Sequence, residues 1–246
     1  MIDFHVHQPR FDSYGPDEFV GAMDELGVDL SVVFTYAGLL RPTPAANDSL
    51  ARFVGSSPER LVAFATVDPR DPGAAAEIER CLDEHGMAGV KLHPWLQGFS
   101  AHEPGLDAVC EVAGRRGVPV LFHDGTPPFS TPLQLASLAK RHPGTIVVLG
   151  HGGLHDLWRE AIAAVETTPN VHLCMCATPP YAMRAIVERC PLDRLLFGTD
   201  AGLVPEVVQR YVTLRIRQLD GLGLTEEQRR AILVENPRRL LAGAVA

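Results

Sequence analysis

Several histidines of this chain stand where short apolar segments end, and two of them are only two residues apart. His5 and His7 close the first such segment, while His123, His151 and Asp200 close three later ones. Residues two apart in a β-strand point to the same face, so the first two imidazoles lie on one side. A lone His-x-His pair is a weak signal. Imidazole nitrogens with a carboxylate nevertheless suit zinc or a similar divalent ion, and the five residues together predict a metal site.

The elements that must position these residues are eight short apolar segments spread evenly along the chain. The segments are Ile2–Val6, Leu30–Thr35, Leu61–Val67, Gly89–His93, Val118–His123, Ile146–His151, Val171–Cys176 and Leu195–Asp200. Their average spacing of about 28 residues is the size of one β/α unit. Each segment is apolar nearly throughout, which is typical of parallel strands covered by helices.

Amphipathic stretches separate the apolar segments and carry the signals of helix ends. Pro16–Leu26 begins with proline, and Pro16–Leu26, Pro72–His85 and Leu106–Arg116 are each followed by glycine. We therefore predict an α/β fold, a (β/α)₈ TIM barrel that forms a single domain over residues 1–246. The alternative is an open doubly wound sheet, which lacks support because no GxGxxG turn follows the first strand.

Beyond the eighth segment, the chain continues with further helical stretches, 205–219 and 225–235. The second opens with Thr225 and has Gln228 three residues later, a pattern that resembles a capping box. We therefore expect an extra C-terminal helix after the last barrel unit.

Strand alternation gives a more detailed expectation for the barrel interior. If His5 and His7 face inward, Asp3 lies below them, and Phe4 and Val6 face the helices. By the same alternation, Leu149 should share the orientation of His151. Active sites of such barrels lie at the carboxyl ends of the strands, where these histidines stand.

Composition limits the partners and the compartment. The 246 residues are 46% hydrophobic with a net charge of −8, and no basic run favours nucleic acid. We see no signal peptide and no apolar stretch long enough for a membrane span. The odd number of scattered cysteines fits reduced thiols in a cytoplasm: Cys81, Cys110, Cys174, Cys176 and Cys190. We interpret Cys174 and Cys176 as buried strand residues rather than as a metal pair. A small-molecule substrate is expected, and a homodimer is compatible with the sequence.

The order of these motifs resembles the amidohydrolase superfamily, and specifically its amidohydrolase-2 branch. The resemblance spans nearly the whole chain and rests on the segments 2–7, 89–94, 150–153, 197–200 and 235–241 together with His123. It is specific for the superfamily and much less specific for a reaction. The resemblance implies a metal centre at the barrel mouth. Its ligands would be His5, His7, His123 and Asp200, and His151 would be a catalytic residue beside the ion.

The resemblance also bears on the residues that would contact the substrate. A lysine in the position of Lys91 can be carboxylated and bridge two metals in binuclear relatives. We favour instead a cation for a substrate carboxylate or a buried partner of Asp3. His93 and Trp95 are candidates for substrate contact, with Trp95 alternatively covering the barrel end. Arg10 would orient an anionic substrate, and an exposed loop charge is the alternative.

Three functions remain open. The first expectation is a hydrolase of a small ester, lactone or amide, in which one divalent ion, Zn²⁺ ahead of Mn²⁺, activates water. Asp200 would take the proton of that water, and His151 would stabilise the oxyanion or shuttle a proton. The second is a non-oxidative decarboxylase of a small aromatic or unsaturated carboxylic acid, and the third is a non-catalytic metal-binding barrel.

Overall fold

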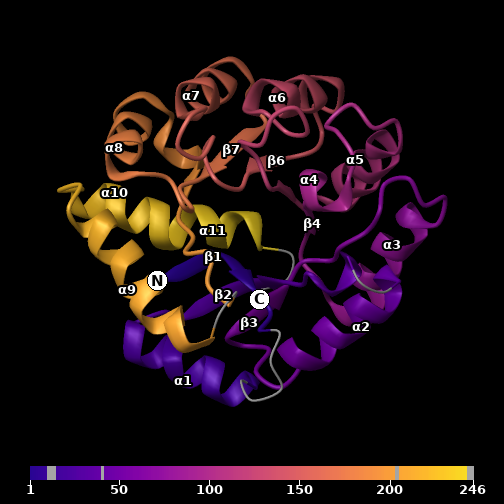
Figure 1. The fold of residues 1–246 in the computed structure, drawn as a ribbon, viewed down its shortest axis with the longest axis horizontal. Helices are drawn as coiled ribbons and strands as arrows, with labels where there is room; N and C mark the ends of the chain where they lie inside the picture. Colours follow the sequence, from indigo (N-terminus) through magenta and orange to yellow (C-terminus); the bar gives the residue numbers. More distant parts are fainter. Residues whose placement is uncertain (10–14, 40–41, 203–204, 243–246) are drawn as a thin grey trace.

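The computed structural model describes residues 1–9, 15–39, 42–202 and 205–242. Within them, eight parallel strands alternate with helices, as the sequence predicts, and form a TIM barrel (Figure 1). The strands are β1 (Ile2–His7), β2 (Leu30–Phe34), β3 (Leu61–Ala63), β4 (Val90–Leu92), β5 (Val120–Phe122), β6 (Val147–Leu149), β7 (Val171–Cys174) and β8 (Leu195–Leu196). Most are shorter than the apolar segments, because the last residues of each segment belong to the loops that carry the polar side chains.

Helices surround the strands in Figure 1. Those in the barrel units are α1 (Pro16–Leu26), α2 (Thr43–Val54), α3 (Ala74–His85), α4 (Pro94–Gln97), α5 (Gly105–Arg116), α6 (Pro132–Arg141), α7 (Trp158–Thr167), α8 (Pro180–Arg189) and α9 (Pro205–Asp220). Short 3₁₀ helices cover Ala37–Leu39 and Leu192–Arg194. Helix α1 has the predicted bounds, and its left-handed cap at Gly27 ends it. Among the described residues, no helix is both long and apolar enough to cross a membrane.

The C-terminal segment is helical in three consecutive pieces. They are α10 (Glu226–Arg230), a π-helical turn over Ala231–Glu235, and α11 (Asn236–Leu240). Thr225 and Gln228 form the expected capping box, with hydrogen bonds in both directions. Leu240 and Leu241 pack into the apolar cluster of the barrel interior, so this extra segment helps to fill the barrel.

Two sheets, β1–β3 and β4–β8, meet at two seams. At the first seam, a parallel bridge joins Ala65 to Val90. At the second seam, the amide of Phe4 donates to the carbonyl of Phe197 at 3.0 Å. The amide of His7 donates to the carbonyl of Ala201 at 2.8 Å. These bonds bring the segment after β8 beside β1.

Two details of the predicted alternation are wrong. Phe4 lies in the interior cluster, with its ring edge-on to Phe64 at 5.7 Å, although Val6 packs towards α1 as expected. The register with β2 shifts between Asp3 and Val6, and such an irregularity interrupts strict alternation. On β6, Leu149 belongs to a helix-facing cluster, because the strand ends there and a bend carries the chain on to His151.

Candidate metal centre

Three of the predicted ligands meet at the seam between β1 and the segment after β8. Oδ1 of Asp200 lies 3.1 Å from Nε2 of His7 and 3.4 Å from Nε2 of His5. One ligand atom from each residue lies within 4.8 Å of the other two. Both histidines are fully buried, whereas the Asp200 side chain keeps 18% exposure towards the mouth. The trio therefore offers two nitrogens and one oxygen with one side open to solvent.

Asp200 is held in place through its backbone. Its φ of 64° is left-handed, a region that aspartate adopts more readily than most residues. Its amide donates to the carbonyl of His5 at 2.9 Å. Below it, buried Asp3 accepts hydrogen bonds from the amide and hydroxyl of Thr199 at 3.0 and 2.5 Å, and from the amide of His5 at 3.2 Å. Asp3 thus ties the two strand ends together, in the position below the histidines that alternation predicts.

The other two predicted histidines lie next along the rim. The ring of His151 is 4.6 Å from that of His5, and the His123 ring is 4.4 Å from that of His151. Nε2 of His123 lies within 3.0 Å of the Thr126 hydroxyl, so the described geometry does not place it in the trio. Its role as fourth ligand stays a prediction. The amide of His151 donates to the carboxylate of Asp124 at 2.6 Å, which fixes the loop that carries this ring.

Lys91 projects into the same buried space. Its Nζ lies 3.4 Å from Nε2 of His5 and 4.7 Å from the ring centre of Phe34. Burial lowers its pKa to about 8, against an opposing effect of the negative charge of Asp200. Among the described residues, Lys91 forms no ion pair with Asp3, whose side-chain partners are Thr199 and the His5 amide. The ammonium is therefore left facing the site.

The remaining residues predicted to contact the substrate are His93, Trp95 and Arg10. His93 is buried, and its ring stacks on that of His123 at 4.0 Å. Trp95 is 43% exposed, with its ring 5.6 Å from that of His93. Arg10 lies outside the described residues, so its expected role stays a prediction. The structure therefore joins His93 and Trp95 into one aromatic wall at the mouth.

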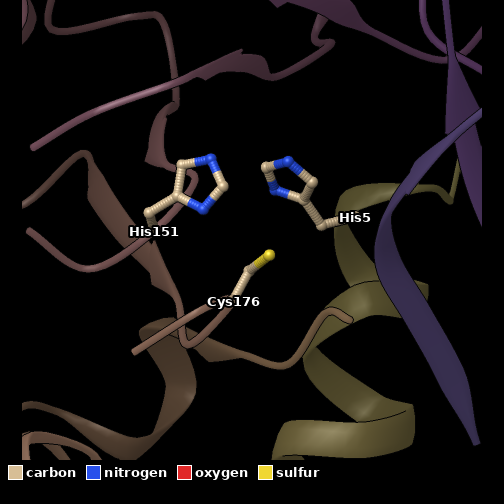
Figure 2. A group of neighbouring side chains, drawn as sticks. All are labelled: His5, His151 and Cys176. Atoms are coloured by element: carbon tan, nitrogen blue, oxygen red, sulfur yellow. The ribbon is translucent and has the colours of Figure 1, made fainter. Parts of the chain in front are cut away.

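Two rim residues were not identified as site residues from the sequence. Tyr36 stacks on His7 with ring centres 3.9 Å apart, and its hydroxyl lies 2.9 Å from Nε2 of His7. Cys176 is buried as expected, but it stands beside His5 and His151 (Figure 2). Tyr36 follows the apolar segment Leu30–Thr35 and Cys176 is the last residue of another, so the strand-end rule that selected the histidines could have found both.

Burial sets the protonation of the site. It lowers the pKa of His5 well below its usual value, that of His93 to about 2 and that of His151 to about 4. Burial alone would raise the pKa of Asp200, but the hydrogen bond to His7 and the positive charge of Lys91 help to bring that pKa well below its ordinary value. At neutral pH the rim thus presents neutral imidazoles and one carboxylate. Nδ1 of His5 and of His123 finds no hydrogen-bond partner among the described residues. This donor set fits a divalent metal.

Comparison with known families identifies the family to which this site belongs. The family model described as Amidohydrolase matches residues 2–242. The chain belongs to the amidohydrolase family. That assignment confirms the resemblance seen in the sequence and supports a metal-dependent enzyme over a non-catalytic barrel.

Two curated relatives of this amidohydrolase are decarboxylases. The γ-resorcylate decarboxylase of a Polaromonas strain is 23% identical over 247 residues, covering 75% of this chain and 76% of the relative. The 2-amino-3-carboxymuconate-6-semialdehyde decarboxylase of Dictyostelium discoideum is 23% identical over 237 residues, covering 82% of this chain and 66% of the relative. The chain thus spans just under two thirds of the second relative.

Solved structures share the fold over nearly the whole chain. A TIM-barrel protein of Bordetella bronchiseptica superposes with a TM-score of 0.80 at 19% identity, covering 100% of this chain and 99% of the other. A dihydroxybenzoic acid decarboxylase of Polaromonas, solved with manganese and the inhibitor 2-nitroresorcinol, gives 0.73 at 18% identity, covering 98% and 96%. At these identities the likeness shows the fold alone.

Proposed function

We propose that this amidohydrolase is a metal-dependent, non-oxidative decarboxylase of a small aromatic or unsaturated carboxylic acid. The proposal reverses the order expected from the sequence, where hydrolysis of an ester, lactone or amide came first. The rim residues alone suit both reactions. The activities of the two curated relatives favour decarboxylation.

The observation that carries the proposal is the buried ammonium of Lys91 beside the metal trio. Its Nζ, 3.4 Å from Nε2 of His5, brings a positive charge into a space from which water is largely excluded. A charge so placed attracts an anionic group strongly, because the surroundings screen it little. Water activation does not require such a cation, whereas holding a substrate carboxylate does.

We assign the ion to His5, His7 and Asp200, with His123 as the proposed fourth ligand once Nε2 gives up its bond to Thr126. One ion is expected at this set of ligands, Zn²⁺ or Mn²⁺, and the manganese in the Polaromonas enzyme keeps the second choice open. When bound, such an ion supplies a Lewis acid for substrate oxygens.

The chain's own residues supply the remaining needs of the reaction. Lys91 orients the substrate anion, and the aromatic wall of His93 and Trp95 packs against its carbon skeleton. The bond between the carboxyl carbon and the skeleton breaks, its electron pair stays on the skeleton, and carbon dioxide leaves. A proton taken from solvent passes through His151 or Asp200 to that carbon, so one proton replaces one carbon dioxide.

The test follows carbon dioxide and acid release separately. Metal-loaded protein is offered a panel of hydroxylated aromatic and unsaturated carboxylic acids, and a second panel of small esters, lactones and amides. We expect carbon dioxide from members of the first panel, lost on chelation and restored by the ion. Turnover confined to the second panel would overturn the proposal in favour of hydrolysis.

A further inference from the structure

A second set of ligand atoms lies on the other side of His5. His5, His151 and Cys176 each offer one ligand atom, and these atoms lie within 4.8 Å of one another. All three side chains are at most 2% exposed. Figure 2 shows one nitrogen of each ring turned towards the sulfur. The proposed decarboxylation has no use for this thiol.

One ring nitrogen of each histidine in this group lies buried without a geometrically formed hydrogen bond to any described residue. Nδ1 of His5 and Nδ1 of His151 are buried and have no hydrogen-bond partner among the described residues. Cys176 is a free, buried thiol. Other buried histidines of the described chain also have an unpartnered Nδ1, and what distinguishes this pair is the thiol within ligand distance of both rings, which gives the nitrogens a metal to share.

His5 can serve both sets because its two ring nitrogens face different partners. Nε2 lies 3.4 Å from Oδ1 of Asp200 and 3.4 Å from Nζ of Lys91. Nδ1, by contrast, is the nitrogen without a partner. The first set therefore takes Nε2, and Nδ1 is left for the second.

We propose that His5, His151 and Cys176 form a second metal position, selective for thiophilic divalent ions such as Zn²⁺, whose occupation removes His151 from the reaction. Two imidazoles and one thiolate are an ordinary zinc donor set. Mn²⁺ prefers oxygen ligands and should stay at the trio with Asp200. As the sulfur–metal bond forms, the thiol proton leaves to solvent. When an ion also occupies the trio, the ring N–H proton of His5 leaves to solvent as well, and His5 bridges the two ions as an imidazolate. The inhibition that this predicts rests on the proposed function, but the metal position does not.

The binding test uses Co²⁺ as a spectroscopic substitute for Zn²⁺ in the full chain stripped of metal. Only a sulfur ligand gives a thiolate-to-cobalt charge-transfer band, so the band reports this position and not the trio. We expect the band in the wild type and in Cys174→Ser, a matched control with a buried thiol two residues earlier that belongs to neither set. Cys176→Ser should lack the band and bind one equivalent fewer. No band in the wild type at saturation, or a band that survives in Cys176→Ser, would overturn the proposal.

The second arm measures zinc inhibition of the manganese-loaded enzyme. Excess Zn²⁺ should lower the activity of the wild type and of Cys174→Ser by about 100-fold or more, as expected when a proton-transfer group is lost. Cys176→Ser should lose far less activity. Exchange of Mn²⁺ at the trio would affect all three proteins equally, and equal inhibition would therefore overturn the regulatory part. If no acid is decarboxylated, the cobalt band still decides the metal position, and the proposed function fails separately.

Discussion

His5 is the residue on which the two ligand sets depend. Burial lowers its pKa well below the usual value, so at neutral pH one ring nitrogen has a free lone pair for a metal and the other carries the proton. The nearby positive charge of Lys91 acts in the same direction. At this scale the site is a set of neutral nitrogens gathered around one carboxylate, and each nitrogen can be tested by its own substitution.

Replacing His151 should separate catalysis from metal binding at the first set. We expect His151→Asn to keep the ion bound by His5, His7 and Asp200 but to lose activity by about 10²–10⁴-fold, the usual contribution of a positioned proton donor. His7→Ala, by contrast, should lose the ion. Metal analysis and carbon dioxide release measured on the same samples check both. Loss of the Mn²⁺ equivalent in His151→Asn would show that this residue is a ligand of the first set.

Lys91 gives a second prediction at the residue scale. Lys91→Met keeps the length of the side chain and removes its charge, so we expect KM for the acid to rise at least about tenfold, the effect of losing about 1.4 kcal/mol of binding. Lys140→Met is the matched control, because the chain has only these two lysines and Lys140 is exposed on α6. Steady-state kinetics on both variants decide the point. An unchanged KM in Lys91→Met would remove the lysine from substrate binding.

At the scale of elements, the sequence was sufficient for the strand order and for most of the rim. Apolar segments bounded by Pro and Gly predicted all eight strands. The predicted range of helix α1, Pro16–Leu26, agrees with the structure. The rule that barrel chemistry lies at strand ends brought His5, His7 and Asp200 together across 193 residues. These features depend on periodicity and topology, which a sequence expresses directly.

What could not be predicted depends on local departures from regular geometry. Strict alternation assigned Phe4 to the wrong face, because the register shift beside Asp3 leaves no mark in the residue pattern. Cys176 looked like an ordinary buried strand residue, since its neighbours His5 and His151 come from other strands. The reaction was also ambiguous, because Asp200 and His151 serve hydrolysis and decarboxylation equally well.

The β1–β8 seam provides a prediction for the elements. A Cβ added to Gly198 would lie 2.4 Å from Cβ of His5, closer than real contacts allow. Gly198→Ala should therefore push β1 away, lower the free energy of unfolding by about 1–3 kcal/mol and weaken metal binding. Gly21→Ala is the control: it lies within α1 with nothing near its Cβ, and should stabilise the protein by about 0.5–1 kcal/mol. Denaturant unfolding and metal titration measure both effects. Wild-type metal affinity in Gly198→Ala would show that seam contact does not position His5.

At the scale of the whole molecule, the metal ligands join the first strand of the barrel to the segment that follows the last strand. His7 ends β1, Asp200 follows β8, and the backbone bonds of the seam hold the two segments together. The unfolded chain separates these ligands by 193 residues, so an ion that binds the trio has high affinity only for the folded barrel. Metal binding and global stability should therefore be coupled.

That coupling predicts a metal-dependent melting temperature. At a free-ion concentration about 100 times Kd, binding to the native state alone adds about 2.7 kcal/mol to the free energy of unfolding. For a chain of this size, that corresponds to a rise in Tm of about 5–10 °C, which a chelator should reverse. His7→Ala should show no Mn²⁺-dependent change in Tm, whereas His155→Ala, on an exposed residue beyond the rim, should keep the full effect.

Mn²⁺ is the appropriate probe, because it should avoid the thiol-containing position and report the trio with Asp200 alone. The comparison is made within each variant, with and without the ion, so that any intrinsic loss of stability on substitution cancels. Equal Mn²⁺ stabilisation of His7→Ala and wild type would mean that the ion binds elsewhere. The segment after β8 would then be joined to β1 by the seam hydrogen bonds alone.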